Sequence, residues 1–173
     1  KLSDINNYTS IIKKGGLNPV IIDVKCFAIK SSVDQVNQLA GTIEESSLTA
    51  ILEFGLDENY LMILYENNPI ITDIFIRAQD RKTLKESTNQ EEMDSLVRRY
   101  ITQVKQAISD FESKYEKRIR SIKVISDLES VQDYLGNFRK SMMNTGFNLF
   151  DPLDRIQIPQ QLSESIDKKN RSH

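Results

Sequence analysis

Apolar residues recur every three or four positions between residues 93 and 115, and this is the strongest hydrophobic pattern in the chain. The spacing predicts an amphipathic helix over Met93–Tyr115 with one buried face. Weaker patterns of the same kind predict helices over Ile5–Ile12, after an N-cap at Asp23, and over Leu128–Met143. The polar stretch Arg77–Asn89 has no such pattern and is predicted to be a loop.

Continuous apolar runs predict a β-sheet in the middle of the chain. The runs Leu48–Phe54, Tyr60–Tyr65 and Ile70–Ile76 are separated by Gly55 and by the turn Asn67–Pro69. Three strands joined by short turns form an antiparallel meander, and their nearly continuous hydrophobicity implies cover on both faces. Further strands are predicted over Pro19–Ile22, Ile119–Ile125, Phe147–Phe150 and Ile156–Ile158.

The order of these elements predicts an α/β fold in which the antiparallel three-strand meander is followed by a βαβαβ arrangement. Right-handed crossovers of that kind place helices on the faces of the sheet. Residues 1–47 are predicted to form the end of a first lobe and a connecting helix, residues 48–162 a second lobe, and residues 163–173 a polar tail. Because the chain starts at Lys1 rather than Met, we expect a piece of a longer protein.

Composition and charge argue against several classes of protein. The 173 residues are 39% hydrophobic and 28% charged, which is typical of a globular domain with a real core. The net charge of −2 gives no overall attraction to nucleic acid, and no apolar run approaches the ~18 residues of a membrane span. Cys26 is the only cysteine and the terminal His173 the only histidine, so a disulfide framework and a histidine base are both missing. We therefore expect neither an enzyme nor a metal site.

Charge is unevenly distributed along the chain. No Lys or Arg occurs between Ser31 and Asp73, whereas basic residues dominate from Arg77 to Lys123. One interpretation is a solvated helix end, because the C-terminus of a helix favours cations. The other is a docking patch for an acidic partner. Under the second interpretation the contact residues are Lys114, Lys117, Arg118 and Arg120.

Residues 50–65 have the outline of a phosphate-binding hairpin: a strand, a tight glycine turn and a second strand. In the actin, sugar-kinase and Hsp70 proteins this hairpin carries Asp-x-Gly followed by small residues. Their N–H groups approach a phosphate while the Asp holds a metal-bound water. Here Glu53 replaces the Asp, and Leu56–Glu58 replace the small residues. Glu53 and Gly55 are the candidate cofactor residues if ATP with magnesium is bound; otherwise Glu53 is a structural acid at a strand end.

Three short segments carry a resemblance to a known family. They are Gly16-Leu17-Asn18-Pro19 leading into Ile22-Asp23-Val24 and Phe27-Ala28, then Leu52-Glu53-Phe54-Gly55, and finally Asn148-Leu149-Phe150-Asp151-Pro152. With the element order, they resemble the second lobe of the actin-like ATPase superfamily, which has a ribonuclease H-like sheet. The type IV pilus assembly protein PilM is most similar, and the cytoplasmic domain of the type II secretion protein GspL is more distantly similar. ATP-binding members also place a Gly-Gly pair after a late strand, but residues 124–130 contain no glycine.

The resemblance implies a non-catalytic scaffold in the inner-membrane assembly platform of a bacterial type IV pilus or type II secretion system. Such a protein is cytoplasmic, peripheral at the inner membrane, and links membrane components to the cytoplasmic motor. Its implied partners are the cytoplasmic tail of a single-span platform protein and the motor ATPase. No cofactor, nucleic acid or membrane insertion is expected. The family's groove for the tail lies largely in the first lobe, so local contact candidates are the strand Ile70–Ile76 and the basic residues 114–123.

Two alternatives stay open at this point. The first is a true ATP-binding actin-like protein, with Glu53 and Gly55 facing the phosphates and magnesium. The second is an α/β interaction module unrelated to the actin fold, in which the meander lies at the sheet edge and no cleft divides two lobes.

Overall fold

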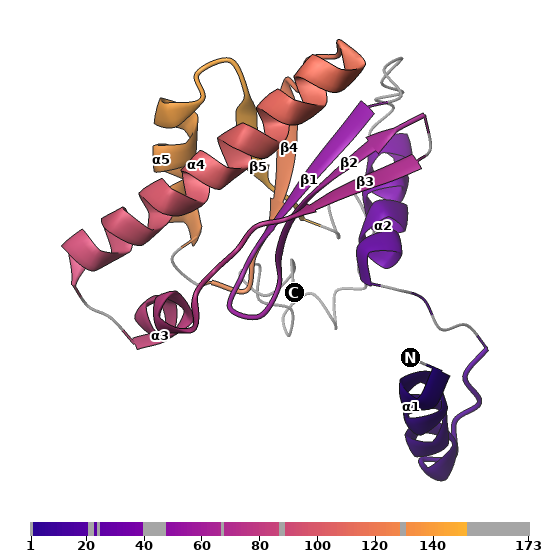
Figure 1. Ribbon diagram of the computed structural model, residues 1–173. Coiled ribbons are helices and arrows are strands. Elements are labelled where there is room, and N and C mark those ends of the chain that lie inside the picture. Colours follow the sequence, from indigo (N-terminus) through magenta and orange to yellow (C-terminus); the bar gives the residue numbers. More distant parts are fainter. Residues whose placement is uncertain are drawn as a thin grey trace.

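The computed structural model describes residues 2–20, 23, 25–39, 48–66, 68–86, 89–128 and 131–151. Within these ranges the chain forms five helices and one five-stranded sheet, so the predicted α/β class is confirmed. Figure 1 shows their arrangement. In chain order the elements are α1 (Leu2–Lys14), α2 (Lys25–Leu39), β1 (Leu48–Phe54), β2 (Asn59–Tyr65), β3 (Asn68–Asp73), α3 (Ala78–Glu86), α4 (Gln90–Tyr115), β4 (Ser121–Ile125), α5 (Val131–Ser141) and β5 (Gly146–Leu149).

The sheet has the strand order β3-β2-β1-β4-β5, with β1 in the middle. Strands β1, β2 and β3 pair antiparallel as consecutive hairpins, which confirms the predicted meander. Strand β4 then pairs parallel to β1, with Glu53 opposite Ile125, and β5 pairs parallel to β4. Each parallel connection runs through a helix, α4 or α5, as the predicted βαβαβ order requires. The carboxyl ends of β1 and β4 therefore lie at the same edge of the sheet.

Both faces of the sheet are covered, as the continuous apolar strands indicated. Helices α4 and α5 lie on one face and α2 on the other (Figure 1). The larger core cluster joins alternate residues of β1, such as Leu52 and Phe54, to the buried face of α4. The smaller cluster joins Ile51 and its neighbours to Val33 and Val36 of α2. Alternation of side chains along β1 thus supplies both layers of the core.

Helix α4 contains the predicted amphipathic segment and begins three residues earlier, at Gln90. The side chain of Asn89 accepts a hydrogen bond from the Glu91 N–H and caps its first turn. Its buried residues follow the predicted spacing of three and four. They are Met93, Leu96, Val97, Tyr100, Ile101, Val104, Ala107, Ile108 and Phe111.

The prediction of a loop over Arg77–Asn89 was wrong, because residues 78–86 form helix α3. Asp80 is buried and holds this helix in place. Its carboxylate accepts hydrogen bonds from Arg77 and lies 2.7 Å from the guanidinium of Arg99 on α4. Because these contacts are polar, α3 shows almost no hydrophobic periodicity in the sequence.

The predicted strand Pro19–Ile22 is also not found in its described part, since Val20 lies outside any strand and is 85% exposed. Helix α1 ends at Gly15–Gly16 as predicted, with Gly16 at a φ of 81° and the Leu17 N–H bonded to the Ile12 carbonyl. None of the α1 side chains is buried. The predicted strand Ile156–Ile158 and the tail 163–173 fall outside the described residues.

Candidate functional site

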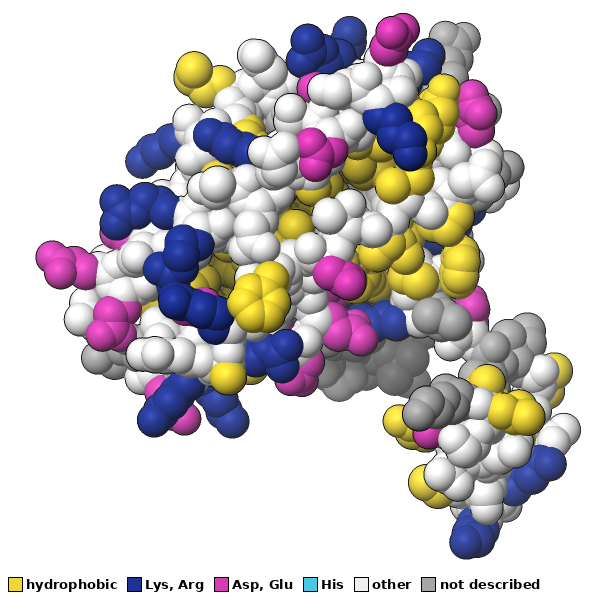
Figure 2. Space-filling view, viewed as in Figure 1, with side chains coloured by type: hydrophobic (Ala, Val, Ile, Leu, Met, Phe, Trp, Pro, Cys, Tyr) yellow, Lys and Arg dark blue, Asp and Glu magenta, His cyan; other side chains and the backbone are white. Residues whose placement is uncertain are grey.

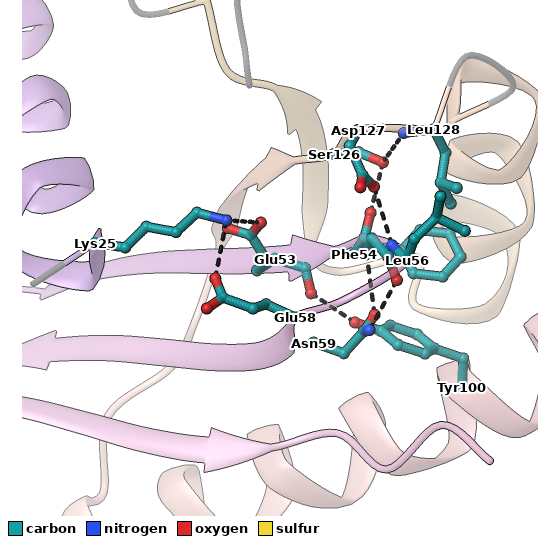
Figure 3. A network of polar contacts seen from close by, with 11 residues as sticks. Lys25, Glu53, Phe54, Leu56, Glu58, Asn59, Tyr100, Ser126, Asp127 and Leu128 are labelled. Carbon is teal, nitrogen blue, oxygen red and sulfur yellow. Dashed lines mark hydrogen bonds and ion pairs between the residues drawn. The ribbon is translucent and has the colours of Figure 1, made fainter. Parts of the chain in front are cut away.

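The β1–β2 turn and the loop that follows β4 meet at the carboxyl edge of the sheet (Figure 3). This edge is where open α/β sheets usually bind their ligands. The antiparallel register places Phe54 opposite Asn59, so residues 55–58 form the turn. Because β4 is parallel to β1, the loop residues Ser126 and Asp127 emerge beside that turn.

Two backbone N–H groups of the turn, those of Gly55 and Leu56, are already bonded to side chains of the same chain. The Gly55 N–H donates to Asn59 Oδ1 at 3.1 Å, and the Leu56 N–H donates to Asp127 Oδ1 at 3.0 Å. Asn59 Nδ2 also donates to the Gly55 carbonyl at 2.8 Å. A phosphate entering this turn would have to displace Asn59 and Asp127 from the donors that a phosphate-binding hairpin offers.

The absence of a side chain at Gly55 leaves room for Asp127. A Cβ atom at position 55 would lie 2.6 Å from Asp127 Oδ1 and 3.2 Å from its Cγ, so the Asp127 side chain would have to shift. The glycine that resembles a phosphate-binding motif therefore accommodates a carboxylate of this chain.

Buried hydrogen bonds fix the strand behind the turn. Ser126 Oγ donates to the Phe54 carbonyl and accepts from the Leu128 N–H at 3.1 Å. Tyr100 on α4 donates from its hydroxyl to the Glu53 carbonyl at 2.7 Å. The end of β1, from which the turn begins, is thus hydrogen-bonded both to α4 and to the loop after β4.

The Glu53 carboxylate is buried on the α2 side of the sheet, where its Oε1 lies 2.7 Å from Lys25 Nζ. The same ammonium lies 2.9 Å from Glu58 Oε2, so Lys25 bridges the two acids. Burial raises the pKa of Glu53, against the opposing effect of Lys25. Burial alone would lower the pKa of Lys25, but its hydrogen bonds to Glu53 and Glu58 outweigh this and raise it. The sequence hypothesis of a structural strand-end acid agrees with this geometry.

The other oxygen of Glu53, Oε2, has no hydrogen-bond partner among the described residues, nor does the hydroxyl of Tyr60. Tyr60 is the cross-strand neighbour of Glu53. Burial, and then the charge of Glu53, raise the pKa of the Tyr60 hydroxyl. No group of three or more His, Cys, Asp or Glu side chains in the described ranges is arranged to hold a metal ion.

The predicted site residues form two separate groups. Glu53 and Gly55 lie at the carboxyl edge of the sheet, whereas the basic residues lie near the amino ends of β1 and β4. That basic group consists of Lys114, Lys117, Arg118 and Arg120.

Sequence reasoning did not identify Lys25, Asn59 or Asp127 as parts of the site. A signal for Asp127 was present, because it comes two residues after β4, and the carboxyl ends of adjacent parallel strands share an edge. Lys25 comes from a helix on the opposite face, and only the tertiary fold brings it to Glu53.

Comparisons with known proteins find similar folds among solved structures. No family model and no curated protein matches the sequence. Nine chains of solved structures match, among them one described as "PilM-PilN type IV pilus biogenesis complex", with a TM-score of 0.66 and 11% identity. The match covers 93% of this chain and 50% of that chain, so the present chain spans about half the length of its structural neighbour. Within the described residues, no helix is both long and apolar enough to cross a bilayer. The chain has a PilM-like fold of the kind expected for an actin-like lobe.

Proposed function

We propose that this chain is part of a non-catalytic, PilM-like scaffold in a bacterial pilus or secretion platform. The scaffold is cytoplasmic and sits at the inner membrane, where it links membrane components to the motor ATPase. The support for this role is the PilM-like fold together with the chemistry of the β1–β2 turn.

The observation that carries the non-catalytic part is the occupation of the turn by side chains. Asn59 accepts a hydrogen bond from the Gly55 N–H, and Asp127 accepts one from the Leu56 N–H. Three carboxylates, those of Glu53, Glu58 and Asp127, surround this end of the sheet, and Lys25 bonds to the first two of them. The local excess of negative charge repels a nucleotide phosphate.

The proposed partner is the short cytoplasmic tail of a single-span inner-membrane protein. The structural neighbour is a complex of PilM with PilN, which supports a pilus partner for a chain of the same fold. Co-expression with each single-span protein of the same platform, followed by affinity purification, tests this part of the proposal. Recovery of none of them would contradict it.

Titration of fluorescent ATP with magnesium tests the non-catalytic part, with Glu53→Ala as the matched variant. We expect no saturable binding to either protein up to millimolar nucleotide. Micromolar binding that is lost in Glu53→Ala would establish the ATP-binding alternative in place of the scaffold.

A further inference from the structure

The segment 114–120, here called the basic segment, joins the end of α4 to β4 and contains four basic residues and one acid, Glu116. It lies near the amino ends of β1 and β4, at the opposite end of the sheet from the Glu53 turn. In Figure 2, Lys and Arg side chains gather around the end of α4 at the top of the view. The C-terminus of α4 explains why cations are favoured in this segment. It does not explain why two surface hollows lie beside the basic side chains.

The backbone of the basic segment is fixed from both sides at Ile119 and Arg120. Glu112 on α4 accepts hydrogen bonds from the Ile119 N–H at 2.8 Å and from Arg118 at 3.0 Å. On the other side, Thr145 Oγ1 donates to the Ile119 carbonyl at 3.1 Å, and the Gly146 N–H donates to the Arg120 carbonyl at 2.8 Å. This end of the segment therefore presents Arg120 from a preorganised backbone, which lowers the entropic cost of binding.

Two surface hollows flank the segment, and Arg118, Ile119 and Arg120 line both of them. One has a volume of about 580 Å³ and extends to the start of β1, where Leu48 and Ala50 form part of its wall. The other has a volume of about 620 Å³ and lies between α4 and the turn before β5. Its apolar lining residues are Ile108, Ile119, Met142 and Met143.

The charges of the segment are available at the surface. Lys117 and Arg120 are exposed, and no carboxylate in the described ranges lies within ion-pair distance of either. Arg118 pairs with Glu112 but keeps 83% of its side chain exposed. Met143 in the adjoining hollow is 89% exposed, and a flexible thioether side chain adapts well to a bound apolar group.

We infer that the basic segment and its two hollows form a docking surface for an acidic segment of a partner protein. Acidic side chains of the partner pair with Lys117 and Arg120, and its apolar side chains enter the two hollows, one of which is lined by Met143. Charge complementarity favours an acidic occupant, and the apolar walls favour a peptide over a polyanion. Nucleic acid fits less well, because specific complexes use a longer row of phosphate contacts and the whole chain has a net charge of −2.

The test is fluorescence anisotropy with a labelled peptide of alternating Glu and Leu, measured at low and at physiological salt. The probes for the competing occupants are a peptide of alternating Glu and Ser, phosphatidylserine-containing vesicles and single-stranded oligothymidylate. The test variant is Lys117→Glu with Arg120→Glu. The matched control is Lys82→Glu with Lys85→Glu on α3, which changes the net charge equally at a distant site.

We expect the Glu-Leu peptide to bind best and to lose at least about tenfold in affinity in the test variant, but less than about twofold in the control. Met143→Ser should lower the affinity for the Glu-Leu peptide and leave the affinity for the Glu-Ser peptide unchanged. Equal losses in the two charge variants, tighter binding of vesicles or oligothymidylate, or no binding of the Glu-Leu peptide would overturn the inference. The readout is independent of nucleotide binding, so it does not depend on the proposed scaffold role.

Discussion

The carboxylate of Asp127 accepts a hydrogen bond from the Leu56 N–H at 3.0 Å, across 71 positions of sequence. A carboxylate and a phosphate oxygen are both anionic acceptors, so Asp127 occupies a donor that a phosphate would use. The β1–β2 turn is therefore closed by the chain itself.

Replacing Asp127 with Ala should destabilise the protein by about 1 kcal/mol, because the Leu56 N–H loses its acceptor. Asp127→Asn should retain most of the stability, since its Oδ1 can accept the same hydrogen bond. Urea denaturation measures both variants. Asp57→Ala, at an exposed acid in the same turn, is the control and should stay within about 0.5 kcal/mol of the parent. Equal stability of all four proteins would contradict the assignment.

Replacing Gly55 with Ala should cost about 1–3 kcal/mol, because the new Cβ meets Asp127 Oδ1 at 2.6 Å. The cost should fall by at least half when Asp127 is also Ala, since the clashing carboxylate is then gone. A double-mutant cycle by urea denaturation measures this coupling. An unchanged penalty in the Asp127→Ala background would show that position 55 needs glycine for a different reason.

Replacing Lys25 with Met should destabilise the protein by about 2 kcal/mol at neutral pH, because it leaves the buried Glu53 carboxylate without its cation. Burial already raises the pKa of Glu53, and loss of Lys25 raises it further. A carboxyl whose pKa is higher in the folded state binds protons more readily there, so the variant should regain stability as the pH falls. Adding Glu53→Gln should abolish that recovery. Denaturation curves that match the parent at every pH would contradict the ion pair.

Asp80 should make the protein sensitive to strong acid. The hydrogen bonds from Arg77, together with the charge of Arg99, lower the pKa of Asp80 to about 2, despite the opposing effect of burial. The resulting stability is present above the ordinary pKa of 3.8 and is lost as the pH falls through about 2. The size should be roughly 1 kcal/mol, since both arginines are half-exposed and screened by solvent.

Thermal unfolding between roughly pH 5 and pH 2, the range in which the carboxyl titrates, measures this effect. In a plot of melting temperature against pH, Asp80→Asn should reduce the fall at the acid end. Arg99→Met should move that fall to higher pH, because one of the cations that lower the pKa of Asp80 is removed. Identical profiles for Asp80→Asn and the parent would exclude Asp80 as the source of the sensitivity.

The elements that hydrophobic periodicity specifies could be predicted from the sequence. Helix α4 and the meander are such elements, because their buried faces repeat with the helical or strand period. Helix α3 could not be predicted in this way, since Asp80 and two arginines hold it and only Leu84 packs against the core. Val20 illustrates the opposite case: it belongs to an apolar run predicted to be a buried strand, yet Val20 lies outside any strand and is exposed.

The candidate site was predictable in outline only. The strand-glycine-strand pattern located the turn at Gly55, but its occupants come from distant parts of the chain. Asp127 reaches the turn because β4 pairs with β1, and Lys25 reaches Glu53 because α2 packs on the opposite face. The position of Asp127 two residues after β4 was a usable signal in the sequence, whereas the contact of Lys25 with Glu53 depends on tertiary packing that residue patterns do not reveal.

A titration of the isotopically labelled protein with ATP and magnesium, followed by backbone amide NMR, reports directly on the N–H groups of the closed turn. We expect the Gly55 and Leu56 amide signals to keep their positions up to millimolar nucleotide, because Asn59 and Asp127 already hold these groups. The amide of Gly146, at the opposite end of the sheet, is the internal reference. Saturable movement of the Gly55 and Leu56 signals at micromolar nucleotide, with Gly146 unchanged, would contradict the closed turn and restore the ATP-binding alternative.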